Sequence, residues 1–509
     1  MTVSKVNIGR AILVSVTFYL ALIAFHGYRF GDEDMTETLS YALYLWDHSL
    51  YPKDLYIQAV AASAWNERFI YTWFLSRFHP YLEITCFILH AIGSILFIIA
   101  LDRLARRYID SQAFQQVFIL LFLFLFYQIN LGGNEAWYNY LMPSQLAKLF
   151  GIWAIVFYVE EKTQLALLLL IPATLMQPIV GAQLSLLFVI TILWRYYETK
   201  TVTSKTLWSM GALAATAGVW LTIVAGHQLM DGNSMEGGQF LDIMELRLGH
   251  HFFPSYFPLK SWLLLTPLIL LGAWIWRPMS QRIFRFFSLS IGIAIFYTLL
   301  IEVFRLPQAV GLQWFKVTVW LKMLSLLAIS SWVASRVDSK DLMSTRAINV
   351  ALLALAMFCV LEISGVFDLV KNRPNHLPGT GYENSAMMLG IEADRRLKED
   401  VCIIVPPDVT GLRYFSKRSI FIDYKSNIHS RSYLAEASRR REKLYGITLD
   451  LRRKGFDPVV SGSDYYHALS TSDFMVQAQR GATHVLVEKP KKLDLIPVIE
   501  NEQFSLYEL

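Results

Sequence analysis

Charged residues are scarce in this chain of 509 amino acids. Only 17% of its residues are Asp, Glu, Lys or Arg, whereas 54% are hydrophobic, and the mean hydropathy is +0.39. A soluble domain carries roughly a quarter charged residues, so this composition excludes a purely water-soluble protein. The formal net charge of +5 is small for the length and gives no footprint for nucleic-acid binding.

Cysteines are few, and the glycine-rich phosphate-binding motifs are absent. Cys86 and Cys359 fall in apolar stretches and Cys402 in a predicted strand, a distribution that indicates neither a disulfide framework nor a metal-ligand spacing. The sequence has no GxGxxG and no P-loop pattern, so a nucleotide site is not supported. No small-residue cleavage site follows the first apolar run, which we therefore expect to remain as an uncleaved membrane span.

Long apolar runs are abundant. A helix needs about 20 mostly apolar residues to cross the hydrocarbon layer. Residues 1–366 are therefore predicted to form a mainly α membrane domain with about eleven transmembrane helices. Gln177-Pro178 alone separates the fifth run from the sixth, which form either two short helices or one broken helix beside a cavity. The eleven segments are 10–28, 82–101, 113–130, 144–160, 163–177, 179–195, 207–226, 260–276, 284–303, 314–335 and 347–366.

The distribution of Lys and Arg predicts the orientation in the membrane. These residues gather in alternate loops, such as 103–107 and 195–205, whereas 131–143 has none and 227–259 has only Arg247. Basic loops stay in the cytoplasm. We therefore expect a bacterial inner-membrane protein with a cytoplasmic N-terminus and, given eleven spans, an extracytoplasmic C-terminal domain.

The pattern changes after a linker rich in Pro and Gly at 367–383. Strands that alternate with helices indicate a mainly parallel sheet, so residues 384–509 are predicted to form a small α/β domain. The expected strands are 401–405, 419–423, 481–487 and 504–507, and the expected helices are 384–398, 431–445 and 464–479.

The most informative polar segment directly follows the first span. Asp32, Glu33 and Asp34, called the acidic triplet below, stand side by side, and adjacent carboxylates repel one another. We expect such a cluster to take up a proton, as a general base does, or to recruit a cation. As an alternative, Asp34 and Glu37 fit a capping box that starts a helix, which leaves the other two carboxylates in a solvated loop.

An acidic triplet after the first span, many further spans and an extracytoplasmic tail resemble the GT-C superfamily of polytopic glycosyltransferases. The resemblance covers the layout of residues 1–366 and one short motif, and the tail lacks the WWDYG-like run of the oligosaccharyltransferase branch. It implies an enzyme that transfers a sugar, with inversion, from a polyprenyl-phosphate donor to a glycan, lipid or protein acceptor.

The resemblance also assigns roles to the first outer loop, residues 29–80. The acidic triplet would supply the catalytic carboxylates, with Asp32 and Asp34 as candidate ligands of a divalent cation, Mg²⁺ or Mn²⁺. The loop would continue in amphipathic helices at 36–47 and 55–78 that lie along the membrane surface.

Five further residues are candidates for binding the substrate. Glu135 would add a carboxylate from the second outer loop, and His250 or His251 would contact a lipid phosphate. Arg305, at an outer turn, and Lys316, in the tenth span, are suited to holding the phosphate as it leaves. Each of the five also fits an ordinary structural role. Glu135 would be a solvated loop acid, the two histidines part of an interfacial belt, and Arg305 and Lys316 snorkelling or paired bases.

Two functions compete with the transferase. A lipid or polysaccharide transporter would show internal repeats and polar residues through the membrane depth, and neither is evident in the sequence. A non-catalytic cell-envelope assembly protein would act through its outer domain and would tolerate substitution of the acidic triplet. In every case the bilayer is an expected partner and nucleic acid is not.

Overall fold

The protein is described by a computed structural model that divides into two compact units. The first unit consists of 1–28, 87–222 and 248–374, and the second of 29–86, 223–247 and 375–509. The structure describes residues 8–63, 65–230, 235–337, 344–367, 369–371, 373–382, 384–449 and 458–509, so residues 368, 372 and 383 of the expected linker lie outside the description.

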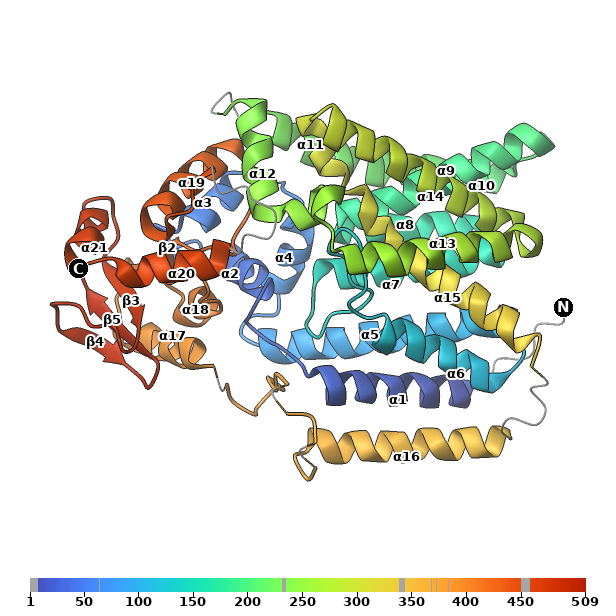
Figure 1. Cartoon of the computed structure of the whole chain (residues 1–509), viewed down its shortest axis with the longest axis horizontal. Helices are drawn as coiled ribbons and strands as arrows, with labels where there is room; N and C mark the ends of the chain where they lie inside the picture. The colour runs from blue at the N-terminus through green and yellow to red at the C-terminus, as the bar shows by residue number, and fades with distance from the viewer. Residues whose placement is uncertain are drawn as a thin grey trace. The chain divides into compact units, whose positions relative to one another are not determined.

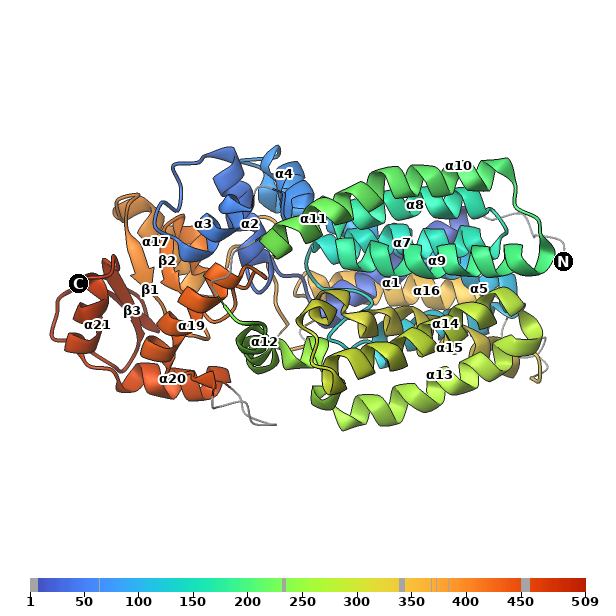
Figure 2. The same cartoon turned by 90° about the horizontal axis from the view of Figure 1, so that it is seen from above.

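The first unit is built from apolar helices that run lengthwise alongside one another (Figure 1, Figure 2). Among the described residues, eight helices are long and apolar enough to cross a membrane, which confirms a mainly α membrane protein. The eight are α1 (Ile8–His26), α5 (Leu82–Tyr108), α9 (Pro178–Thr199), α10 to α11 (Ser204–Gly226), α13 (Leu259–Met279), α14 with η4 (Gln281–Val303), η5 to α15 (Pro307–Ala334) and α16 (Thr345–Ile363).

The other three expected spans form shorter apolar helices. They are α6 with η1 (Gln112–Leu125), α7 (Pro143–Val159) and α8 (Thr163–Met176). At 1.5 Å per residue their lengths are about 20–26 Å, less than the ~30 Å of hydrocarbon that a straight span crosses. By length and composition alone, eight of the described helices are therefore able to cross a membrane, and these three are shorter than a straight span.

Close approach between helices is provided by small residues. Ala21 and Ala24 of α1 pack on the buried Cys359 of α16. At the break after α8, Gln177 is extended and α9 begins at Pro178, so the fifth and sixth runs are two separate helices packed together. A Cβ atom on Gly181 would lie 2.3 Å from the backbone of Thr174 in α8, so only glycine allows this contact.

The first loop folds into three short helices of the second unit, α2 (Met35–Trp46), α3 (Leu55–Ala62) and α4 (Phe69–Ser76). The single helix expected at 55–78 is wrong, because the chain leaves helical geometry after α3 and resumes it only at Phe69. Leu39 and Leu43 of α2 are buried within the protein, whereas Trp46 is 53% exposed. The apolar face expected to lie on the membrane is thus largely used for packing.

The C-terminal residues form a five-stranded sheet in the order β2-β1-β3-β5-β4. The first three strands in this order are parallel, while β5 runs antiparallel to both β3 and β4. A small C-terminal α/β fold is therefore confirmed, with an antiparallel edge that the sequence pattern did not predict. The strands are β1 (Cys402–Ile404), β2 (Ser419–Ile422), β3 (His484–Glu488), β4 (Pro497–Glu500) and β5 (Phe504–Glu508).

Helices pack on this sheet around an apolar core. The expected helices are found as α17 (Ser385–Arg396) and α19 (Arg431–Tyr445), whereas the third is divided into α20 (Pro458–Ala468) and α21 (Thr471–Ala478). A short helix, α18 (Leu412–Ser416), connects β1 to β2. The core contains Ala386, Leu389, Ala393, Val401, Ile403, Val405, Leu412, Ile420, Leu486, Ile499, Phe504 and Leu506.

Candidate functional site

The acidic triplet lies in the second unit and is engaged by groups from the C-terminal residues. An Asp32 carboxylate oxygen accepts a hydrogen bond from the hydroxyl of Thr410 and another, of 2.8 Å, from the backbone N–H of Glu33. Lys425 Nζ lies 2.9 Å from an Asp34 oxygen and 3.2 Å from a Glu33 oxygen, and Arg29 pairs with Glu33 at 2.6 Å. All three carboxylates are half-exposed; Glu33 and Asp34 are paired with cations, and Asp32 is hydrogen-bonded to neutral groups.

The capping alternative for Asp34 and Glu37 is not what the structure shows. Asp34 occupies the N-cap position of α2, but its side chain makes no capping hydrogen bond there. Glu37 is buried and bonds instead to Arg68 and, at 3.1 Å, to the backbone N–H of Asn427. Both carboxylates thus bind partners from other elements, so helix capping does not explain them.

Lys425 belongs to the segment 423–430 that follows β2, called the β2–α19 loop below. Burial disfavours the charge of Lys425, but Asp34 and Glu33 outweigh burial and hold its pKa above the usual value. The loop begins at the carboxyl end of a parallel strand, the edge where ligands bind in open α/β sheets. Its position on this edge brings a cation to the first loop of the chain.

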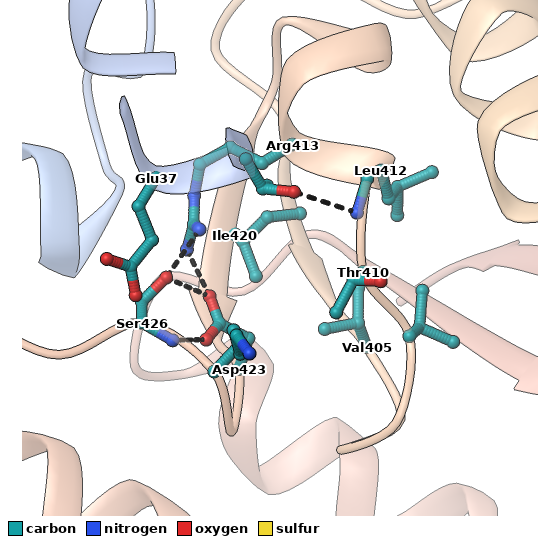
Figure 3. Close-up of a pocket in the computed structure, with 12 residues that line it drawn as sticks. Glu37, Val405, Thr410, Leu412, Arg413, Ile420, Asp423 and Ser426 are labelled. Atoms are coloured by element: carbon teal, nitrogen blue, oxygen red, sulfur yellow. Dashed lines mark hydrogen bonds and ion pairs between the residues drawn. The ribbon is translucent and has the colours of Figure 1, made fainter. Parts of the chain in front are cut away.

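A small pocket lies beside the triplet, between the start of α2, the residues after β1 and the β2–α19 loop (Figure 3). Its volume of about 20 Å³ is room for a water molecule and not for a sugar. Thr410 and Lys425, which bind the triplet, are among the lining residues. The triplet therefore adjoins the pocket through its partners.

Arg413 of α18 makes three side-chain hydrogen bonds. Its guanidinium donates to Asp54 at 2.8 Å, to Ser426 at 2.7 Å and to Asp423 at 2.5 Å, and the latter two bonds are drawn in Figure 3. Burial disfavours the charge of Arg413, yet the two carboxylates raise its pKa well above the usual value. Burial likewise opposes charge on Asp423, but Arg413 outweighs it and lowers the pKa of this carboxyl.

Asp54 connects the first loop to the sheet. One of its carboxylate oxygens caps α3 by accepting the N–H of Ile57 at 3.0 Å, and the other accepts the N–H of Ile420 in β2 at 2.8 Å. The Asp54 side chain is fully buried. Because a buried carboxylate needs such partners, this aspartate fixes α3 against β2 and positions Arg413 between them.

Glu37 is a second buried acid of the pocket, besides Asp423. Burial raises the pKa of its carboxyl, and the positive charge of Arg68 opposes this effect only in part. Arg68 itself also donates to the hydroxyl of Tyr56 and, at 2.9 Å, to the carbonyl of Asn427. A carboxyl with a raised pKa in a pocket is a candidate for proton transfer.

Four of the five other expected site residues lie around one segment of the first unit, residues 131–138. The carbonyl of Glu135 accepts a hydrogen bond from buried Lys148. The carbonyl of Lys316 accepts a 2.8 Å bond from Asn134, and Nδ1 of His251 donates to the carbonyl of Gly132 at 3.2 Å.

His250 completes this group, because its ring lies 4.1 Å, centroid to centroid, from the ring of His251. A Cβ atom on Gly133 would lie 2.3 Å from the His251 ring, so the glycine is needed for this approach. Arg305 has its guanidinium 5.2 Å from the ring centre of Phe253. The structure thus brings Glu135, Lys316 and the histidines together in the first unit, and the acidic triplet belongs to the second.

The triplet does not present an open set of metal ligands. The ammonium of Lys425 lies between Asp34 and Glu33, where a divalent cation would meet the same oxygens and a positive charge. Among the described residues, no group of three or more His, Cys, Asp or Glu side chains is arranged to hold a metal ion.

Sequence reasoning missed the partners of the triplet, which come from residues almost 400 positions away. Thr410, Arg413, Asp423 and Lys425 were not predicted as site residues. A usable signal existed, since Asp423 ends an expected parallel strand and the residues after such strands form binding edges. No local pattern in the first loop indicates that it folds against this edge.

No protein-family model matches this chain, and no curated protein matches it.

Proposed function

We propose that this protein is a membrane glycosyltransferase that moves a sugar from a polyprenyl-phosphate donor to an acceptor hydroxyl. The observation that carries the proposal is the half-exposed acidic triplet, of which Glu33 and Asp34 pair with Lys425, beside a small pocket. The apolar helices of the first unit support a bilayer location, where the isoprenoid chain of such a donor resides. The pocket is smaller than a sugar, so the proposal requires the β2–α19 loop to open when substrate binds.

In this mechanism Asp32 is the general base. Its carboxylate already accepts a hydrogen bond from one hydroxyl, that of Thr410, and an acceptor hydroxyl would bind in the same way. Asp32 takes the acceptor proton while the acceptor oxygen attacks the anomeric carbon. The bond from that carbon to the phosphate oxygen breaks, the lipid phosphate leaves with the electron pair, and the anomeric centre is inverted.

Lys425 is proposed to supply the positive charge for which Mg²⁺ or Mn²⁺ was expected. It is held by Glu33 and Asp34, and an ammonium group can stabilise the charge that develops on a leaving phosphate. On this proposal Glu33 and Asp34 position the lysine, and Asp32 acts on the acceptor.

The proposal includes a topology. The three shorter apolar helices, α6 with η1, α7 and α8, would cross the membrane with the other eight and give eleven spans. Basic loops would then lie in the cytoplasm, and the acidic triplet and the C-terminal sheet outside it, in the bacterial inner membrane. Glu135, the two histidines, Arg305 and Lys316 are proposed to contact the donor.

One observation favours a non-catalytic assembly protein as the second candidate. Each carboxylate of the triplet is already hydrogen-bonded or ion-paired, as expected of residues that hold the first loop to the C-terminal fold. A structural role of this kind needs no substrate cavity. The transferase and the assembly protein differ in what they predict for Asp32.

The deciding experiment replaces single carboxylates in the full-length protein. Asp32→Asn should lower sugar transfer by about 10²-fold or more, the typical contribution of a general base, with insertion and folding unchanged. The assay uses purified protein and a panel of polyprenyl-phosphate sugars. Glu392→Gln, which changes an acid of α17 that pairs with Arg395 and Arg396, is the matched control and should keep full activity. Equal activity of Asp32→Asn and the control would reject the transferase mechanism.

A further inference from the structure

Two arginines of the second unit carry charge in the protein interior without a carboxylate partner among the described residues. Arg247, in α12 (Gly237–Phe252), is 7% exposed, and Arg441, in α19, is 1% exposed. Nε and Nη1 of Arg247 and Nη1 of Arg441 are buried and have no hydrogen-bond partner in the part of the chain that the structure describes. Buried cations are normally paired, because removal from water without a partner is costly.

The arginines are held in place by the β2–α19 loop. Arg441 donates from Nε to the carbonyl of Asp423 at 3.0 Å and from Nη2 to the carbonyl of Ser426 at 2.8 Å. The guanidinium of Arg247 lies 4.3 Å from the ring centre of Tyr424. These contacts fix both side chains but supply no negative charge to either.

Asp423 is a carboxylate whose charge acts on both arginines, but its side chain is already bonded to other groups. Asp423 is bonded through its side chain to Arg413 and to Ser426. Burial first, and then repulsion by Arg441, lower the pKa of Arg247 to about 10. The two guanidinium groups therefore destabilise each other, and an anion between them would remove that repulsion.

We propose that Arg247 and Arg441 form a binding site for a phosphoryl group. Guanidinium groups bind phosphate through charge-assisted hydrogen bonds, and the stacking of Arg247 on Tyr424 is a common support for such an arginine. Three nitrogens on two side chains remain to be satisfied, and a phosphoryl group offers three oxygens where a carboxylate offers two. The phosphoryl group belongs to a free phosphate or to a lipid headgroup.

This site is independent of the proposed transferase activity, because it concerns binding by the resting protein without a sugar donor. Arg247 is also the only Lys or Arg in residues 227–259. The inference would hold for an assembly protein as well.

The test measures phosphate binding by the full-length protein in detergent. Thermal unfolding and calorimetric titration are followed with inorganic phosphate, with farnesyl phosphate and with acetate, each against chloride at equal ionic strength. Inorganic phosphate should raise the melting temperature of the wild type above that in chloride, and acetate should do so less. Stabilisation by inorganic phosphate assigns a free anion, and stabilisation by farnesyl phosphate alone assigns a lipid headgroup.

Arg247→Met is the informative variant. It should weaken phosphate affinity by about tenfold or more, the value of one charge-assisted contact, and it should melt in chloride at or above the wild-type temperature because an unneutralised buried charge is gone. Arg439→Met removes the same charge from the exposed face of α19, where Arg439 pairs with Glu436, and should bind phosphate as the wild type does.

Two results would overturn the inference. One is a wild-type protein whose stability is the same in phosphate and in chloride. The other is a phosphate response of equal size in the wild type and in Arg247→Met, since binding would then occur elsewhere. If Arg247→Met does not fold, Arg247→Lys keeps the charge but loses the planar fork, and its affinity should lie below that of the wild type.

Discussion

At the scale of single residues, the ion pairs around Arg413 determine how the second unit responds to acid. The pKa of Asp423 is lower in the folded protein than in the unfolded chain, where a typical aspartate has a pKa of about 3.9. A carboxyl with a lowered folded-state pKa contributes stability that is complete above the unfolded pKa. That contribution is lost as the pH falls through the folded pKa.

Asp423→Asn tests this assignment. At pH 7 the variant should be less stable than the wild type by about 3 kcal/mol, the typical cost of breaking a buried ion pair. The difference should shrink as the pH is lowered from about 5 towards 3, because the wild type then loses the same interaction. Thermal unfolding of both proteins across this range is the measurement. The exposed Asp494→Asn serves as control, and a gap that stays constant with pH would contradict the role of Asp423.

Residue identity alone predicted the acidic triplet of this site but not the groups that bind it. The acidic triplet stands out in the sequence because three adjacent carboxylates follow an apolar run. Its partners do not, because Lys425 is 392 positions from Glu33 and Thr410 is 378 from Asp32. Long-range pairing is decided by the fold of the whole unit, and a single lysine in a polar loop gives no local sign of it.

At the scale of elements, the helix expected at 464–479 shows why boundaries were harder to predict than elements. Its apolar periodicity runs through two helices, but Ser470 starts α21 with a capping box in which its side chain and that of Asp473 bond reciprocally to the backbone. The S-x-x-D spacing was present in the sequence. The apolar periodicity continues through both α20 and α21, so the pattern predicted one helix and the capping signal at Ser470 was overlooked.

Ser470→Ala should loosen α21 without altering the rest of the fold. Loss of an N-cap costs about 1 kcal/mol, which corresponds to roughly fivefold faster hydrogen exchange of the α21 amides when they open locally. Hydrogen–deuterium exchange of the full chain gives the rates. The amides of α17, which is capped by Asn384, provide an internal control and should keep their protection. Unchanged exchange in α21 would show that packing of Phe474 alone maintains this helix.

At the scale of the whole molecule, each of the eleven spans expected from hydropathy is found as a helix. Eight of these helices are long enough to cross a membrane, and three are shorter. The hydropathy of a segment is a sum over many residues, so a single atypical residue does not hide a span. Whether a short helix crosses the bilayer depends instead on its tilt, on its neighbours and on local thinning, none of which a sequence window contains. The number of crossings is therefore the part of the topology that needs an experiment.

With the N-terminus in the cytoplasm, as proposed, the parity of the number of spans decides on which side the C-terminal fold lies. An odd number of spans, as in the proposed eleven, places the two ends of the chain on opposite sides of the membrane, whereas eight spans place them on the same side. Lys200→Cys marks the basic loop between α9 and α10, and Lys492→Cys marks the C-terminal fold; both positions are exposed. The native residues Cys86, Cys359 and Cys402 are buried, so labelling background should be low.

With a membrane-impermeant thiol reagent on intact cells, the Lys492→Cys protein should be labelled and the Lys200→Cys protein should not. After permeabilisation both should react, which controls for expression and folding. The reverse result, labelling of the Lys200→Cys protein and not of the Lys492→Cys protein in intact cells, would place the C-terminal sheet in the cytoplasm, because five spans separate the two positions. The acidic triplet, which folds in the same unit as that sheet, would then also face the cytoplasm, and a donor presented at the outer surface could not reach it.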